Sequence, residues 1–527
     1  MNKLLDTLKN ALRFDNVLSD NYELLETEFG EPDNSSDKNR KSYEKPTPEE
    51  ALFKELDKNL DKLRTAYRTD ISKDLVIREF SLCGKIRSAI AFINGMVDSD
   101  MINNFILRDG MQGSIPDDVE DVCEYAVNNI FTVNDISMTD KYSDTVKAVL
   151  DGLTVVLIDG SEKACTVDTR KYPQRSVEAA ENEKDVLGPK EAFIENLRTN
   201  ITLIRRHVHT NDLVCEMRTC GEDTKTNIGI LYRDGVADES LVAEVKKRIA
   251  AIKTRSVIST GIINQMIEKN AISPFPQTLM TERPDRCASY IADGHIAVLC
   301  DGSPIAAILP VTLFSLLSAP ADTYSRQAIG NVMRIVRYIG ALISVTLPGI
   351  FIAIVMYHQG FLSSEILSTL ITSRKMVFIP IGVELLMLLF VFQLVREAGM
   401  RVPGTIGQAI GIIGGLVLGQ AVVSANLASS VVLILVALTG LGTFGIPDYT
   451  TQLCTVYFRV LFILAGWLGG FMGLTCATII FIAYLTTLKS FGVPFLTPYS
   501  PKTYSKRPGM FRGPINSGRT KKEDYMQ

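Results

Sequence analysis

One carboxylate lies inside a strongly apolar stretch of this chain. Glu384 stands in the run IPIGVELLMLLF at 379–390. A carboxylate in hydrocarbon costs at least about 2.5 kcal/mol, so the group must be paired, protonated or close to water. We therefore consider two roles for Glu384. It either contacts a cation path or forms a structural ion pair with Arg459, an arginine beside another apolar block.

A run of small residues forms the second feature of this apolar part. Four glycines follow one another at a spacing of four, with two further glycines and a glutamine beside them, and the whole set is Gly404, Gly407, Gln408, Gly411, Gly414, Gly415 and Gly419. Membrane helices associate through close backbone approach over small residues. The stripe predicts a packing face, either within one subunit or against a copy in a neighbouring subunit, with Gln408 beside an aqueous path.

Residues that would carry catalysis or hold a metal do not form a recognisable set. The nine cysteines contain no CxxC pair, and the chain has no P-loop. Ser161 and Ser303 follow Asp-Gly pairs without a GxSxG elbow, so we interpret them as turn residues. His207 and His209 are interpreted as surface histidines. We expect no enzyme activity, no metal and no cofactor.

Five apolar blocks dominate the C-terminal part, at 336–357, 376–395, 406–423, 431–444 and 460–488. A membrane span needs about 20 apolar residues, which the first three blocks approach. The fourth block is short. The fifth is too long for one upright span and barely long enough for two. The pattern predicts an all-α membrane domain at 326–490.

Basic residues at both ends of this domain predict its orientation. Arg326 and Arg334 precede the first block and Arg337 lies at its start, and seven lysines and arginines follow the last block, at 502–522. Basic residues beside spans favour the cytoplasmic side, so both ends are expected there and the number of spans is expected to be even. Either the fifth block crosses the membrane twice, or one block does not cross it. The best candidate for a block that does not cross is the second one, at 376–395. We expect four to six membrane elements.

The N-terminal half has the composition of a water-soluble protein, unlike the apolar C-terminal part. Its start, MNKLLDTLKNALRFD, lacks the apolar core of a secretory leader, which favours a cytoplasmic location. The net charge of −4 argues against nucleic-acid binding. The phrase DGLTVVLIDGS at 151–161 returns as DGHIAVLCDGS at 293–303. Each contains a strand ending in Asp-Gly, a strong hairpin signal. We therefore predict two α+β subdomains with one such hairpin each.

The predicted domain boundaries follow these changes of composition. A short helix and polar linker occupy 1–50, and the two α+β subdomains occupy 51–180 and 181–325. The membrane domain at 326–490 is followed by a basic cytoplasmic tail at 491–527.

Several longer stretches resemble one known family. The runs VLGPKEAFIENLRTNITLIRRHV (186–208), SPFPQTLMTERPDR (273–286), IADGHIAVLCDGSPIAAILPVTLF (291–314), SAPADTY (318–324) and REAGMRVPGTIGQAIGIIGG (396–415) are similar to the GerA family of spore germination proteins. The resemblance covers about 75–510, and the TERPD and Asp-Gly stretches are its most distinctive parts. It includes the stage V sporulation protein AF, a sister member that shares these signatures.

The resemblance implies the A subunit of a nutrient germinant receptor in the spore inner membrane. It implies a permease-like B subunit and a lipoprotein C subunit as partners, and an oligomer of A subunits that forms a nutrient-gated ion conduit. The alternative is a non-channel scaffold or accessory protein that tunes a permease-like partner. A secondary transporter would show inverted repeats among the membrane blocks. The sequences of these blocks show no clear repeat, which disfavours a transporter.

A short connector joins the second hairpin to the first apolar block. It contains Pro320, Ala321, Asp322 and Tyr324, and its proline marks a turn. We expect it to be the place where movement of the soluble part reaches the membrane part.

Overall fold

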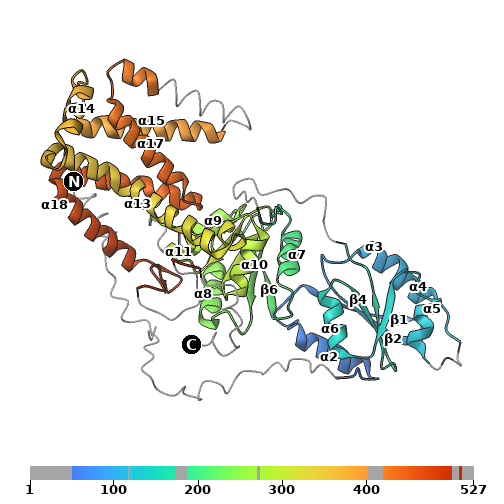
Figure 1. Cartoon of the computed structure of the whole chain (residues 1–527). Coiled ribbons are helices and arrows are strands. Elements are labelled where there is room, and N and C mark those ends of the chain that lie inside the picture. The colour runs from blue at the N-terminus through green and yellow to red at the C-terminus, as the bar shows by residue number, and fades with distance from the viewer. Residues whose placement is uncertain are drawn as a thin grey trace.

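The computed structural model describes residues 50–116, 119, 121–171, 187–269, 273–401, 419–500 and 510–512. Two α/β units lie next to each other and are followed by a region of long helices, as Figure 1 shows. We call residues 51–171 the first α/β unit, residues 187–311 the second α/β unit and residues 327–487 the helical region. The predicted linker at 1–50 falls almost wholly outside the described residues.

The first α/β unit is built on a five-stranded antiparallel sheet. Its strand order is β1-β2-β4-β5-β3, with β1 (Leu75–Leu82), β2 (Ile86–Ile93), β3 (Ile136–Thr139), β4 (Thr154–Ile158) and β5 (Ala164–Val167). Helices α2 (Leu56–Ala66) and α6 (Tyr142–Leu150) cover one face. The other face packs against η2 (Ile102–Arg108) and α5 (Val122–Asn129), with the short α3 (Ser99–Met101) and α4 (Asp109–Gln112) at the ends of η2. The apolar residues of the sheet are therefore buried on both sides.

The second α/β unit repeats this topology. Its order is β6-β7-β9-β10-β8, with β6 (Leu213–Cys220), β7 (Thr226–Arg233), β8 (Leu279–Thr281), β9 (Ile296–Cys300) and β10 (Ala306–Leu309). Helices α7 (Leu197–His207) and α10 (Pro284–Ala292) cover one face, and α8 (Glu239–Ala250) and α9 (Thr260–Ile267) cover the other. The predicted pair of hairpin-containing units is present, and the two sheets share one strand order.

The repeated Asp-Gly phrase has a structural reason beyond turn formation. Gly160 and Gly302 have φ of +87° and +80°, which glycine adopts without strain. The preceding aspartates each accept a hydrogen bond from the first residue of a helix, Asp159 from the Leu56 amide at 3.0 Å and Asp301 from the Leu197 amide at 3.2 Å. Each turn therefore also satisfies a free amide at the start of the helix that covers its sheet.

A buried ion pair joins the two α/β units. Asp74, which precedes β1, binds Arg205 of α7, and both side chains are buried. Ser72 donates to the same carboxylate at 2.6 Å, and the Lys73 amide donates to the Cys215 carbonyl at 3.3 Å. The two units are therefore joined through specific polar contacts as well as through the chain.

Long apolar helices form the C-terminal part. They are α13 (Gln327–Tyr357), α15 (Ile381–Arg401), α17 (Ser430–Phe444) and α18 (Tyr449–Thr487), with the shorter η3 (Gln359–Phe361) and α14 (Ser364–Arg374) after α13. Among the described residues, α13 and α18 are long and apolar enough to cross a membrane by length and composition. The helix α17 is apolar but shorter.

The longest helix, α18, is a helical hairpin. Gly470 has φ 56° and ψ −139°, which interrupts the helix. The rings of Phe458 and Phe481 lie 4.7 Å apart between centroids, although an unbroken helix would separate these residues by about 34 Å at 1.5 Å per residue. We call Tyr449–Gly469 the first leg and Phe471–Thr487 the second leg. The predicted 460–488 block thus folds back on itself.

The chain returns to the second α/β unit after this hairpin. Strands β11 (Lys489–Ser490) and β12 (Val493–Pro494) form a small ribbon whose Ser490 hydroxyl donates to the Gln277 carbonyl at 2.6 Å. Leu488 and Phe495 belong to the core on the α7 and α10 face of the second unit. The beginning of the predicted tail at 491–527 is therefore packed against this unit.

Close packing of α18 on α13 should depend on Gly466. A side chain added there would collide with the Gly349 carbonyl of α13, whereas one added at Gly469, in the same leg, would meet nothing within 4 Å. We expect Gly466→Leu to lower the free energy of unfolding by about 1–3 kcal/mol or more, because the backbones must separate. Thermal unfolding of the purified full chain would measure this. An equal loss in Gly469→Leu would contradict the packing described here.

Candidate functional site

The connector between the second α/β unit and α13 contains a buried carboxylate. The connector, residues 312–326, includes α11 (Leu313–Leu316) and α12 (Ala321–Tyr324). Asp322 is only 2% exposed. Its carboxylate accepts a hydrogen bond from Arg334 Nε at 3.1 Å, and two from Arg337 at 2.9 and 3.1 Å. Because the two arginines are three residues apart, they share one face of α13 and converge on one carboxylate.

Short backbone contacts fix the same carboxylate from the connector side. The Ala319 amide donates to Asp322 at 3.1 Å. Pro320 precedes α12 and Ala321 is its first residue, so these two shape the turn that presents Asp322. A side chain at Gly330 of α13 would lie 2.8 Å from the Asp322 carbonyl oxygen, so glycine permits the helix to approach. We call Asp322, Arg334 and Arg337 the connector clamp.

The other side of the connector is attached to the TERPD segment at 281–285. Tyr324 donates its hydroxyl hydrogen to Asp285 at 2.5 Å, and Arg283 binds the same carboxylate at 2.8 and 3.1 Å. Arg286 donates to the Ser318 carbonyl at 2.9 Å. Since α10 begins at Pro284, these contacts join the connector to the start of a helix in the second α/β unit.

The ionisation of Asp285 depends on these partners. Burial alone would raise the pKa of its carboxyl, but the hydrogen bonds from Arg283 and Tyr324 outweigh burial and hold the pKa below its ordinary value of 3.8. Asp285 is therefore an anion at neutral pH.

A residue near the end of the chain also contacts the connector. Arg512 donates from its side chain to the carbonyls of Asp322 and Ser325, at 2.8 and 3.1 Å. Its backbone amide donates to the Asn331 side chain at 2.8 Å, and its carbonyl accepts from Gln327 and Asn331. Arg512 thus brings a segment about 180 residues further along the chain to the connector and the start of α13.

The predicted pairing of Glu384 with Arg459 is wrong in this structure. Glu384 is fully buried, lies 3.3 Å from Arg374 and accepts a hydrogen bond from the Ser429 amide at 2.6 Å. It therefore holds a free amide at the start of α17. Arg459 donates to Thr443 near the other end of α17. From Ser429 to Thr443 a helix rises about 21 Å, so the two charges are too far apart to pair.

The glycine stripe is largely untested by the structure. Gly404, Gly407, Gln408, Gly411, Gly414 and Gly415 lie outside the described residues. Gly419 lies inside them, and a side chain there would meet Leu433 of α17 at 3.5 Å. Close glycine contacts do occur elsewhere, between Gly340 of α13 and Gly442 of α17.

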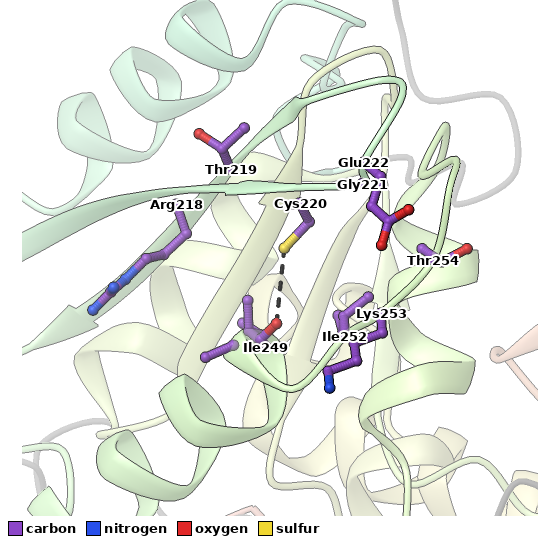
Figure 2. A pocket seen from close by; sticks show the side chains of 10 residues that line it. Arg218, Thr219, Cys220, Gly221, Glu222, Ile249, Ile252, Lys253 and Thr254 are labelled. Atoms are coloured by element: carbon purple, nitrogen blue, oxygen red, sulfur yellow. Dashed lines mark hydrogen bonds between the residues drawn. The ribbon is translucent and has the colours of Figure 1, made fainter.

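A cavity of about 340 Å³ opens on the second α/β unit, between the end of β6 and the end of α8. Figure 2 shows Cys220 directed at the Ile249 carbonyl, to which its sulfur donates at 3.8 Å, while Arg218 runs away from Lys253. Burial raises the pKa of the Cys220 thiol, so this thiol is not activated as a nucleophile. Within the described ranges, no three His, Cys, Asp or Glu residues are grouped to hold a metal ion.

The connector is predicted from the sequence, but its chemistry is not. From the sequence, Arg334 and Arg337 are expected only as charges that flank a span, and no contact is expected for Asp285. Their signals were present: an arginine pair at helical spacing, an aspartate in SAPADTY, and a second aspartate in TERPD.

Comparisons with known proteins agree with one another. The family described as Bacillus/Clostridium GerA spore germination protein matches residues 61–524. Spore germination protein GerLA of Bacillus cereus is 33% identical over 456 residues, which cover 85% of this chain and 92% of the relative. Spore germination protein B1 of Bacillus subtilis (strain 168) is 31% identical over 449 residues, covering 84% and 91%.

The comparison with solved structures gives a match in the N-terminal half. The crystal structure of the N-terminal domain of the A subunit of the Bacillus megaterium spore germinant receptor GerK3 is 30% identical, with a TM-score of 0.41, and the match covers 50% of this chain and 97% of that one.

Removing the central carboxylate should destabilise the protein strongly. Asp322→Ala leaves two largely buried guanidinium groups without their counter-charge, which costs about 3–5 kcal/mol in comparable buried pairs. Thermal unfolding of the purified full chain measures this loss. The exposed Asp223→Ala, in the second α/β unit, serves as the control and should change stability by no more than about 0.5 kcal/mol. Similar losses in both variants would show that the clamp adds nothing.

Tyr324→Phe should make the contribution of Asp285 visible through pH. Because the folded pKa of Asp285 is depressed, its stabilising effect is present above pH 3.8 and is lost as pH falls through the folded pKa. At pH 7 we expect the free energy of unfolding of wild type to exceed that of Tyr324→Phe by about 1 kcal/mol. The part of this difference that depends on the charge of Asp285 should vanish in acid. Unfolding followed from pH 7 to pH 2.5 tests this. A difference that grows on acidification would contradict the assignment.

Proposed function

Because the chain belongs to the GerA family of spore germination proteins, we propose that it is the A subunit of a nutrient germinant receptor. In this proposal it resides in the spore inner membrane with a permease-like B subunit and a lipoprotein C subunit. The A subunits assemble with one another as a nutrient-gated ion conduit that starts germination. Two observations support this role: long apolar helices follow two α/β units, and a buried polar connector joins the two parts.

The membrane topology that we propose has six crossing elements. Cys454 near the start of the α18 hairpin and Leu485 near its end both pack on the second α/β unit. The first leg therefore runs away from this unit and the second leg runs back towards it. Arg334 near the start of α13 lies at the connector, while Tyr357 at its other end contacts Trp467 beside the hairpin turn. The helix α13 therefore runs alongside the first leg, away from the α/β units.

The directions of α15 and α17 supply the remaining crossings. Glu384 contacts Ser429, and further along both helices Phe392 contacts the Gly440 and Phe444 region, so the two helices run parallel. A parallel pair requires the chain to return between them. The apolar block at 406–423 has the length for that return. Six elements place both ends of the helical region on the same side, which we assign to the cytoplasm.

Coupling in this proposal passes through the connector. Tyr324 contacts the start of α10 in the second α/β unit, and Asp322 contacts α13. A displacement of the second unit therefore acts on α13 through short, buried hydrogen bonds. The helix α13 in turn packs against α17 and both legs of α18 over glycines. This continuous set of contacts is the single observation that carries the coupling role.

A flexible insertion should separate the two parts. A Gly/Ser segment placed after Ala321 enters neither α/β unit nor any helix of the helical region. It interrupts α12 and removes the fixed relation of Asp322 and Tyr324 to the preceding chain, including the Ala319 contact to Asp322. We expect loss of nutrient-triggered germination in spores that still contain the protein in their membrane. The control is the same insertion at 172–186, between the two α/β units. Normal germination with the connector insertion would contradict the coupling role.

A membrane scaffold or accessory protein that tunes a permease-like partner, without forming a channel, is the alternative proposal. Ion flux through the purified chain in lipid vesicles separates the two functions. The conduit predicts flux that depends on assembled A subunits, and the scaffold predicts none.

A further inference from the structure

Arg459 carries a charge into the interior of the helical region. It lies in the first leg of α18 and is 4% exposed. Its Nε donates to the Ser344 carbonyl at 2.7 Å, and one terminal nitrogen donates to the hydroxyls of Ser344 and Thr443 at 2.9 and 2.5 Å. All of these acceptors are neutral. They satisfy hydrogen bonds and join α13, α17 and α18, but they do not neutralise the guanidinium.

A second arginine increases the positive charge at this place. Arg396 of α15 is partly buried, and its Nε and one terminal nitrogen are buried without a hydrogen-bond partner. It lies one turn beyond Phe392, whose ring packs on Gly440 and Phe444 of α17. Arg459 binds Thr443 in the same stretch of α17, so the two arginines approach one segment of that helix. Within the part of the chain that the structure describes, no carboxylate forms an ion pair with either arginine within 4 Å. Two cations thus face one region without a counter-charge.

Two arginines without a counter-charge in this interior are energetically unfavourable unless an anion binds to them. An isolated cation in a low-dielectric interior loses much of its hydration, which neutral hydroxyls replace only in part. Guanidinium groups offer several N–H donors in a plane, and their strongest partners are anions. Unused donors on Arg396 beside a fixed Arg459 meet this requirement.

We propose that Arg396 and Arg459 form an anion-binding site inside the helical region, whose ligand is a small monovalent anion, either a halide or a carboxylate. Ser344 and Thr443 hold the Arg459 side of the site, and Arg396 supplies the free donors. The same positive charge repels cations. Any cation path in the assembled protein therefore runs outside this site.

The test uses the purified full chain in lipid nanodiscs, with unfolding followed by fluorescence of Trp467, the one tryptophan of the sequence. Sodium gluconate is replaced by sodium bromide or by sodium formate at constant ionic strength. We expect bromide, formate or both to raise the unfolding temperature of wild type by about 2–4 °C at saturating concentration. The bromide and formate arms distinguish a halide from a carboxylate ligand.

Variants assign the effect to the site. Arg396→Gln and Arg459→Gln should each lose the anion-dependent rise, whereas Arg459→Lys should retain part of it because the charge remains. The exposed Arg87→Gln in the first α/β unit is the control and should keep the full rise. If Arg459→Gln does not fold, Arg396→Gln still decides the question, since this side chain has unused donors.

Two results would overturn the proposal. One is a wild-type unfolding temperature that is the same in gluconate, bromide and formate. The site would then be neutralised by a carboxylate of another protein chain or left uncompensated. The other is a rise that Arg396→Gln and Arg459→Gln both retain in full, which would place anion binding elsewhere. Neither result bears on germination by connector variants, so the proposed function is tested separately.

Discussion

The buried carboxylate of Asp322 between Arg334 and Arg337 is the interaction on which the arrangement of this molecule depends. It lies where the second α/β unit ends and α13 begins, and Tyr324, two residues later, contacts Asp285 on the opposite side. A buried charged group is costly to leave unpaired, so the connector has few alternative positions of similar free energy. Because short hydrogen bonds extend from α10 to α13, the connector does not act as a flexible linker. It holds the second α/β unit in a fixed position relative to the helical region.

Other polar contacts extend this rigid arrangement in both directions. Towards the N-terminus, the Asp74 and Arg205 pair joins the two α/β units. Towards the helices, Arg459 joins α13, α17 and α18, and Glu384 holds the start of α17. These charged residues are few and buried, and each connects elements that are distant in sequence. A movement that crosses the molecule therefore acts through these buried residues and not through the surface charges.

The sequence predicted the elements of this protein better than the contacts between them. Alternating apolar runs and the Asp-Gly turns identified the hairpins, because both signals are local. The shared strand order required long-range pairing, which no local pattern contains. Glu384 was recognised as unusual from its apolar surroundings, but its partner was assigned wrongly, because pairing depends on which helix ends meet. The long 460–488 block left one or two passes open until the positive φ of Gly470 showed where it turns.

The central claim is that Asp322 and its arginines act as one energetic unit that joins the α/β units to the helices. A double-mutant cycle between Asp322 and Arg334, measured by unfolding of the purified full chain, tests this most directly. Asp322→Ala and Arg334→Ala are compared singly and together. The account predicts that the double variant loses less than the sum of the two single losses, with a coupling of at least about 1 kcal/mol. Losses that add to within about 0.5 kcal/mol would show that the two residues do not act together and would contradict the account.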